Sequence, residues 1–302
     1  MKEKIIIITG LTASGKSSLA IKLAKEFNGE IVNADSVIFY KYLNIGSAKP
    51  SKEELSVVKH HLIDIIEPTE HFTAHDFADR ADILIKKISD KGKIPIIVGG
   101  SPLYIKALLK GFFEIPEASK EIKSKIKNKI KKLEKIELYN ELKKVDPITA
   151  ERLHINDQQR VGRALEVYLS TGKKLSDFHK EHAFKKTKYN YIKVAIDYNR
   201  EIIYNRINKR VDLMINDGLV KEVKSLLKYR DEKVMKSIGY KEIISYLNNE
   251  YTLEEAIDKI KQHTRNFAKR QTTWLKKESD IKWFDSSKQK EIIELVEQFI
   301  GD

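Results

Sequence analysis

The chain has 302 residues, 41% of them hydrophobic, which is enough apolar content to fill a folded core. Lysine and arginine outnumber aspartate and glutamate by 57 to 44, a net charge of +13 that indicates a polyanionic partner, nucleic acid first. The chain contains no cysteine, which excludes a disulfide framework and a cysteine-based zinc site.

The first forty residues predict a phosphate-binding loop between a buried strand and a helix. Residues 5–8 are four isoleucines, the pattern of a strand buried on both faces of a parallel sheet. The strand runs into GLTASGKS, which fits the phosphate-loop pattern G-x-x-x-x-G-K-[ST], and a helix is expected over 18–27. Its glycines let backbone N–H groups turn toward phosphate oxygens. The predicted diphosphate- or nucleotide-binding residues are Gly10, Leu11, Thr12, Ala13, Ser14, Gly15, Lys16 and Ser17, with the Ser17 hydroxyl as a ligand for Mg²⁺.

A second strand is expected over 30–33, just before Asp35. Because ligands bind outside the carboxyl ends of the strands in open α/β sheets, Asp35 should face the same crevice as the phosphate loop. The alternative is that Asp35 merely caps a helix.

Further strands are expected at 60–66, 93–98, 191–196 and 281–284. Thr73 and Asp76 have the spacing of a capping box and predict a helix from 73 to 88. Gly99, Gly100 and Ser101 follow the strand at 93–98 and should lie at the ligand edge of the sheet.

Residues 113–188 read as an all-helical insertion. A helix is expected over 119–144, a segment with ten lysines and four glutamates, and another over 158–170, where Arg160 and Arg163 share a face. A basic helix is most often only a solvated face, but here it adds to a chain already strongly positive, which favours binding to a polyanion. Residues 1–112 and 189–302 then form a discontinuous core. The predicted fold is an α/β protein with a P-loop NTPase-like parallel sheet flanked by helices.

From residue 200 onward the pattern is mostly helical. Arg206 and Arg210 are four residues apart, and a final basic helix is expected over 253–277.

The apolar run near the N-terminus is one strand long, so we expect no signal peptide, and no run reaches the length of a membrane-spanning helix. These patterns alone leave a kinase, an NTPase switch and a diphosphate-using transferase open.

The motifs resemble one family over almost the whole chain, the bacterial tRNA dimethylallyltransferases, also called tRNA isopentenyltransferases. The resemblance rests on GLTASGKS at 10–17, NADSVIFYKYLNIGSAKP at 33–50, HHLIDI at 60–65, DQQRVGRALEVYLSTGKKLS at 157–176, YNRINKRVDLMINDGLVKEV at 204–223, KSIGYKE at 236–242 and TRNFAKRQTTWLKK at 264–277. The resemblance implies transfer of the dimethylallyl group of dimethylallyl diphosphate to the exocyclic N6 amine of the adenosine 3′ of the anticodon, with release of diphosphate. It also implies Mg²⁺ as cofactor, the tRNA anticodon stem-loop as partner, no membrane partner, and a cytoplasmic monomer.

The resemblance assigns roles to individual residues. Asp35 would be the base that accepts the amine proton, with Lys16 and Ser101 as the other catalytic residues. The implied tRNA contacts are Asp35, Ser36, Val37, Ile38, Ser101, Lys123, Gln159, Arg160, Val161, Gly162 and Arg163.

This sequence departs from the family pattern at a few positions. Ser101-Pro102 stands where the family has Thr-Gly, Leu11 where Pro is common, Lys123 where Arg is usual, and Gly162 where an apolar residue is usual. Lys123 would give a point charge in place of a bidentate phosphate contact, and Gly162 would cost about 1 kcal/mol of helix propensity.

Two other functions remain as alternatives. A P-loop small-molecule or nucleoside kinase would need a second Mg²⁺-binding carboxylate, for which Asp64 is a candidate, and the basic insertion could serve as its lid. The second alternative is an RNA-binding protein whose phosphate loop senses a nucleotide without catalysis.

Overall fold

The computed structural model describes residues 2–111, 118–132, 134–182 and 187–302. The chain divides into two compact units. The core unit comprises Met1–Leu109 and Thr187–Asp302, and the helical unit comprises Lys110–Lys186. The boundary expected at 112/113 falls outside the described residues.

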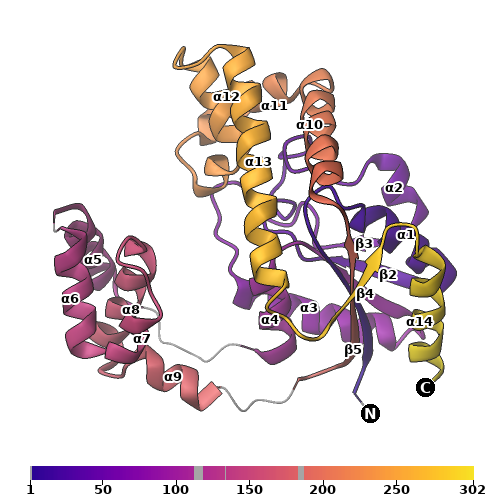
Figure 1. Ribbon diagram of the computed structural model, residues 1–302, viewed down its shortest axis with the longest axis horizontal. Helices are drawn as coiled ribbons and strands as arrows, with labels where there is room; N and C mark the ends of the chain where they lie inside the picture. The colour runs from indigo at the N-terminus through magenta and orange to yellow at the C-terminus, as the bar shows by residue number, and fades with distance from the viewer. Residues whose placement is uncertain (1, 112–117, 133, 183–186) are drawn as a thin grey trace. The chain divides into compact units, whose positions relative to one another are not determined.

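The core unit is built on one sheet of six parallel strands in the order β3-β2-β4-β1-β5-β6 (Figure 1). The strands are β1 Lys4–Thr9, β2 Gly29–Asn33, β3 His60–His61, β4 Ile94–Val98, β5 Asn190–Asp197 and β6 Ile281–Asp285. The central strand β1 pairs with β4 and β5, so the chain enters the sheet in the middle and returns to it after the insertion. The predicted parallel α/β sheet is confirmed.

Helices cover both faces of this sheet. Ile5, Ile6, Ile7 and Ile8 of β1 are fully buried. Ile6 and Ile8 pack with α1 (Lys16–Glu26) and α14 (Gln289–Gly301), and the alternation of a strand turns Ile5 and Ile7 to the opposite face. Helix α3 (Ala74–Ser89) packs on β2 and β4, and its expected capping box is present. Two shorter helices, α2 (Lys52–Val57) and α4 (Pro102–Lys110), lie in the loops after β2 and β4.

The strand expected over 60–66 is wrong beyond its first two residues. Leu62 and Asp64 adopt left-handed backbone conformations, with φ of 61° and 54°, and a strand cannot contain them. The segment instead leaves the sheet as a loop in which Ile65 N–H donates to Phe39 O at 2.8 Å.

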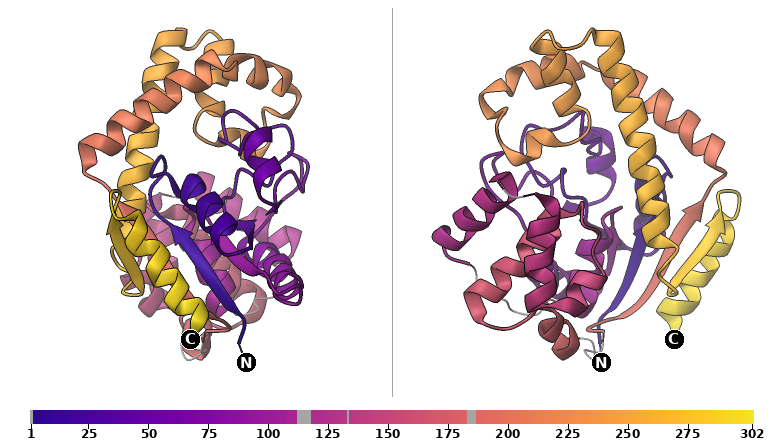
Figure 2. Two further views of the ribbon diagram at one scale, coloured as in Figure 1. Left: turned by 90° about the vertical axis from the view of Figure 1, so that its right-hand side faces the viewer. Right: turned by 60° about the vertical axis from the view of Figure 1, so that its left-hand side comes forward.

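A second group of helices stands at the carboxyl end of the strands. Helix α10 (Arg200–Asn216) leaves β5, and α13 (Leu253–Leu275) packs beside it and leads back to β6, as both views in Figure 2 show. Between them lie α11 (Leu219–Ser225), α12 (Tyr240–Leu247) and two 3₁₀ turns, Leu227–Tyr229 and Lys233–Lys236. This group covers the edge of the sheet at which α/β proteins bind their ligands.

The helical unit contains α5 (Lys120–Lys132), α6 (Lys135–Val145), α7 (Pro147–Glu151), α8 (Gln158–Thr171) and α9 (Leu175–His182). The single helix expected over 119–144 is wrong, because Glu134 caps a new helix through a capping box with Glu137. The expected helix over 158–170 is confirmed, and it ends at Gly172 in a left-handed conformation.

Gly162 has a packing role in the helical unit. A Cβ atom there would lie 2.9 Å from Ile130 Cδ1 and 3.1 Å from Ile126 Cγ2, so the glycine lets α8 approach α5 closely. This contact offsets part of the helix propensity that the glycine gives up.

Candidate active site

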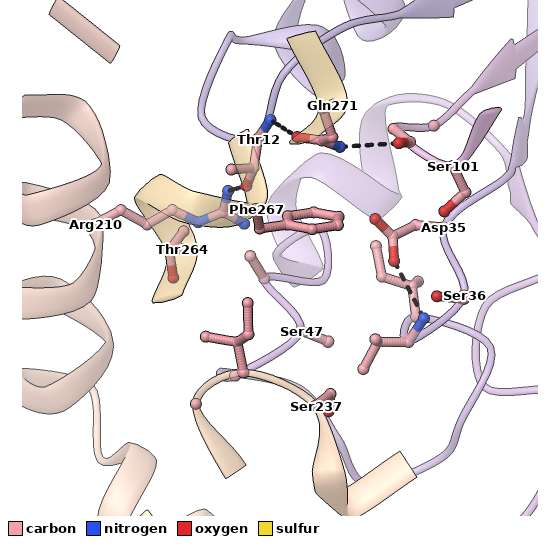
Figure 3. Close-up of a pocket in the computed structure, with 18 of the residues that line it drawn as sticks. Thr12, Asp35, Ser36, Ser47, Ser101, Arg210, Ser237, Thr264, Phe267 and Gln271 are labelled. Atoms are coloured by element: carbon pink, nitrogen blue, oxygen red, sulfur yellow. Dashed lines mark hydrogen bonds between the residues drawn. The ribbon is translucent and has the colours of Figure 1, made fainter. Parts of the chain in front are cut away.

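A cavity of about 490 Å³ lies in the core unit at the carboxyl end of the strands (Figure 3). Segments far apart in the sequence line it: the phosphate loop, residues 35–38, 46–48, 99–101 and 236–239, and one side each of α10 and α13. The predicted residues Thr12, Lys16, Ser17, Asp35 and Ser101 therefore lie around one space.

The phosphate loop has the backbone that its sequence predicts. Gly15 has φ 81° and directly precedes α1, and Ala13 is also left-handed, with φ 61°. No side chain among the described residues caps the start of α1, so its first N–H groups remain available to an anion.

Gln271 of α13 joins the phosphate loop to the loop after β4. Its Oε1 accepts from Thr12 N–H at 2.8 Å, and its Nε2 donates to Gly100 O at 2.8 Å (Figure 3). The side chain is 5% exposed. Gln271 therefore fixes the distance between two loops that both line the cavity.

Two arginines of α10 reach the phosphate loop. Arg206 Nε donates to Ala13 O at 2.7 Å and thereby holds the left-handed residue in place. One turn later Arg210 Nη1 donates to Thr12 Oγ1 at 3.3 Å and lines the cavity (Figure 3). The sequence shows that these two arginines are four residues apart. The structure shows that this spacing brings both side chains to the phosphate loop.

The cavity is strongly cationic. Lys16, Arg210, Lys236, Lys241 and Arg270 line it, and Asp35 is the one carboxylate among the described lining residues. Burial lowers the pKa of Lys16 to about 8, against the attraction of Asp35, and burial also lowers the pKa of Arg210. Because burial destabilises the charged forms of these two side chains, an anion that binds in the cavity is stabilised by them.

Asp35 follows β2 and sits in a turn. Its Oδ1 accepts from Val37 N–H at 3.1 Å, and its own N–H donates to Asn33 Oδ1 at 3.3 Å. Residues 36–39 form turns and no helix starts there, so the helix-cap alternative for Asp35 is wrong. Figure 3 shows its carboxylate directed into the cavity toward the ring of Phe267.

Four more of the predicted residues of the core unit lie around the same cavity. Ser36, Val37, Ile38 and Ser101 all line the cavity and are half-buried. Pro102 is the first residue of α4, where the missing N–H costs no helical hydrogen bond. Replacing the family's glycine by proline is thus compatible with this loop.

The predicted residues of the helical unit differ in exposure. Gln159, Arg160 and Arg163 are exposed on α8, whereas Val161 and Gly162 are buried in its packing interface. Arg160 and Arg163 form ion pairs with Asp157 and Glu166 on the same helix. Lys123 is half-buried on α5. A contact between tRNA and Val161 or Gly162 stays a prediction.

The donor set fits a magnesium ion that is held mainly by a diphosphate. Ser17 and Asp35 offer oxygen atoms at the cavity, and no group of three His, Asp or Glu side chains that could hold a metal exists in the described part of the chain. Asp64, the candidate acid of a kinase, is absent from the lining and pairs with Lys49.

Sequence reasoning named neither Gln271, Arg210 nor Phe267 as site residues. Gln271 and Phe267 belong to the segment TRNFAKRQTTWLKK, and Arg210 to YNRINKRVDLM, so the motifs contained them. Their position opposite the phosphate loop follows only from the packing of α10 and α13.

No helix in the described ranges is both long and apolar enough to cross a membrane.

Comparisons with known proteins agree on one family. Residues 38–278 match the family model described as IPP transferase. A tRNA dimethylallyltransferase from Caldanaerobacter subterraneus subsp. tengcongensis is 48% identical over 290 residues, covering 94% of this chain and 92% of the relative. tRNA dimethylallyltransferase 1 from Citrifermentans bemidjiense is 50% identical over 287 residues, with 94% and 92% covered.

Solved structures give the same result. The tRNA isopentenylpyrophosphate transferase of Bacillus halodurans superposes with a TM-score of 0.74 at 37% identity, over 99% of this chain and 97% of that chain. A eukaryotic dimethylallyltransferase acting on tRNA superposes with a TM-score of 0.82 at 32% identity, over 94% and 74%. Since the family model spans most of the chain and relatives of similar length share nearly half of its residues, the chain belongs to the IPP transferase family, the family of the tRNA dimethylallyltransferases.

Proposed function

We propose that this protein transfers the dimethylallyl group of dimethylallyl diphosphate to the N6 amine of the adenosine 3′ of the anticodon in tRNA. The observation that carries the proposal is the pairing, in one cavity, of a phosphate loop with Asp35, the one carboxylate that the described part of the chain contributes to the lining. Its relatives are named tRNA dimethylallyltransferases.

The phosphate loop serves the leaving group in this reaction. The N–H groups at the start of α1, together with Lys16 and Arg210, hold the diphosphate and stabilise the charge that develops as its C–O bond breaks. The Ser17 hydroxyl would hold Mg²⁺ at this end of the cavity, and the ion would supply further positive charge for the leaving diphosphate.

Asp35 activates the nucleophile by accepting its proton. The lone pair of N6 is delocalised into the adenine ring, so the amine attacks effectively only as it loses a proton. The new N–C bond forms at C1 of the dimethylallyl group, the C–O bond to diphosphate breaks, and the N6 proton passes to the Asp35 carboxylate. One Asp35 oxygen is engaged by Val37 N–H, which fixes the orientation of the other.

The helical unit serves the RNA. Its α5 and α6 segment, 119–144, carries ten lysines and four glutamates, and Arg160 and Arg163 extend this positive charge onto α8. Phosphate contacts of this kind position an RNA without reading its sequence. The proposed working form is a monomer in the cytoplasm, the compartment that a tRNA substrate implies.

A labelling experiment tests the proposal. The protein is incubated with radiolabelled dimethylallyl diphosphate, Mg²⁺ and unmodified tRNA, and the digested nucleosides are separated. Label in a prenylated adenosine is the expected outcome. Phosphate transfer from ATP without tRNA would instead favour the kinase, although the described residues that line the cavity include no second carboxylate, which a kinase would require. RNA binding that responds to ATP and survives loss of Asp35, without any transfer, would favour a nucleotide sensor.

A further inference from the structure

Glu222 makes an unusual set of contacts outside the cavity. It lies on α11 and does not line the cavity. Its Oε2 accepts from the backbone N–H groups of Asn44 at 3.0 Å and Ile45 at 2.8 Å, and its Oε1 accepts from Gly46 N–H at 3.1 Å. One carboxylate thus gathers three consecutive backbone N–H groups, as a bound anion does in a backbone nest.

Tyr240 completes this arrangement. Its hydroxyl donates to Glu222 Oε1 at 2.8 Å, and the ring is fully buried. Burial and then the charge of Glu222 raise the pKa of Tyr240, so the phenol stays protonated and remains a donor. The ring also packs on Gly46, where a Cβ would lie 2.5 Å from Tyr240 Cε2.

The four groups bound to Glu222 belong to two chain segments, 44–46 and Tyr240, that are continuous with the lining of the cavity. Gly46 begins the lining segment 46–48, and Tyr240 directly follows the lining segment 236–239. Figure 3 shows Ser47 and Ser237, one from each segment, together at the end of the cavity away from Thr12. The two segments are nearly 200 residues apart in sequence, and Glu222 is bonded to both.

We propose that Glu222 is a positioning residue that holds these two segments together and so shapes the end of the cavity away from the phosphate loop, the end at which the RNA acceptor binds. The proposal rests on the proposed function. The phosphate loop occupies the other end and is held by Gln271 and Arg206 instead. Loss of the Glu222 bonds therefore disturbs binding of the RNA acceptor and leaves the diphosphate end intact.

The test uses the full chain with Glu222→Gln, which keeps the size but replaces one acceptor oxygen by an NH₂ group facing N–H donors. Hydrogen exchange at the amides of Asn44, Ile45 and Gly46 should become at least about tenfold faster. The KM for unmodified tRNA should rise by about tenfold or more. The Kd for inorganic diphosphate with Mg²⁺ should stay within about twofold, because that end has its own bonds.

Matched variants make the outcome specific. Glu297→Gln on α14 changes an exposed glutamate in the same way and should behave as wild type. Tyr240→Phe removes one of the four bonds and should give a smaller effect in the same direction. Gly46→Ala drives a Cβ into the Tyr240 ring and should raise the KM for tRNA as well, whereas Gly301→Ala, with open space around it, should not.

The results separate this proposal from the proposed function. Unchanged exchange at 44–46 or an unchanged KM for tRNA in Glu222→Gln overturns the positioning role, as does an equal loss of diphosphate affinity, which would indicate general unfolding. Should Glu222→Gln fail to fold, the same readouts on Tyr240→Phe decide. If the wild-type protein transfers no label to tRNA, the proposed function fails, while the exchange measurement still tests the bonds of Glu222.

Discussion

The two units of this protein use the same basic residues in different ways. In the core unit the cations are turned inward, and Lys16 and Arg210 are buried enough that their pKa values fall. In the helical unit Arg160 and Arg163 are exposed, each in an ion pair on its own helix. From this difference we expect the core unit to use its cations to bind a small anion and to catalyse its reaction, and the helical unit to use its cations to bind an extended polyanion.

The units also differ in how far apart their working residues lie in sequence. The Gln271 side chain joins Thr12 to Gly100, and Arg206 holds Ala13, so the core site depends on contacts over more than 150 residues. The site of the helical unit is a helix surface with neighbours three residues apart. Substitutions in the first should therefore change the reaction, and substitutions in the second should change the affinity for RNA.

The largest effect is expected from Asp35→Asn. This variant keeps the size and one hydrogen-bond acceptor but removes the base, so kcat for transfer should fall by about 10² to 10⁴-fold. Binding of tRNA and of diphosphate should change much less. Single-turnover transfer measures the loss, and the melting temperatures of Asp35→Asn and Asp35→Ala control for folding. Transfer by the Asn variant at nearly the wild-type rate would remove Asp35 as the base.

Lys16→Ala should reduce transfer by about 10² to 10³-fold, because the leaving diphosphate loses one full charge. The affinity for tRNA should survive, since the exposed arginines are in the other unit. Filter binding of labelled tRNA beside the transfer assay separates the two. An equal loss of tRNA affinity would contradict the division of labour between the units.

The lowered pKa of Lys16 predicts that diphosphate binding and protein stability depend on pH. Because its pKa is lowered from 10.5 to about 8, the free protein loses this proton as the pH rises through 8, and a bound diphosphate requires it back. The Kd for diphosphate should thus weaken above pH 8 by up to about tenfold per pH unit. The free energy of unfolding should change in the opposite direction. The buried charge of Lys16 destabilises the folded protein below pH 8, and this destabilisation is lost as the pH rises from 8 to 10.5. Calorimetric titrations of wild type and Lys16→Met check the binding effect, which the variant should lack.

The smallest effect is expected from replacing Arg160 and Arg163 together by glutamine. If each arginine contacts one phosphate, the slope of log Kd against log salt should decrease by about 2 in total, while kcat at saturating tRNA stays unchanged. Binding measured from about 50 to 200 mM salt gives the slope. A slope equal to that of wild type would exclude both residues from the RNA interface, and a lower kcat would tie them to the chemistry of the core unit.

The sequence by itself determined the elements whose causes are local. Four isoleucines made β1, GLTASGKS made the phosphate loop, Thr73 and Asp76 capped α3, and Gly172 ended α8, because each depends on neighbours within a few residues. The position of Asp35 just after a predicted strand placed it at the cavity for the same reason, since the carboxyl end of a strand is a local position. One local pattern gave a wrong prediction. The apolar run at 60–66 predicted a strand, but the left-handed backbone at Leu62 and Asp64 ends the strand after two residues.

Only the tertiary structure decided which distant groups meet. Nothing within reach of Gln271 in sequence indicates that its amide spans Thr12 and Gly100, and nothing near Glu222 indicates three N–H groups at 44–46. Such contacts form because α10, α11 and α13 pack over the carboxyl edge of the sheet, and the packing of buried surfaces, which has no signature in local periodicity, fixes their register. The close approach at Gly162 has the same origin in helix packing, whereas the break in the 119–144 helix is local, at the capping box of Glu134 and Glu137.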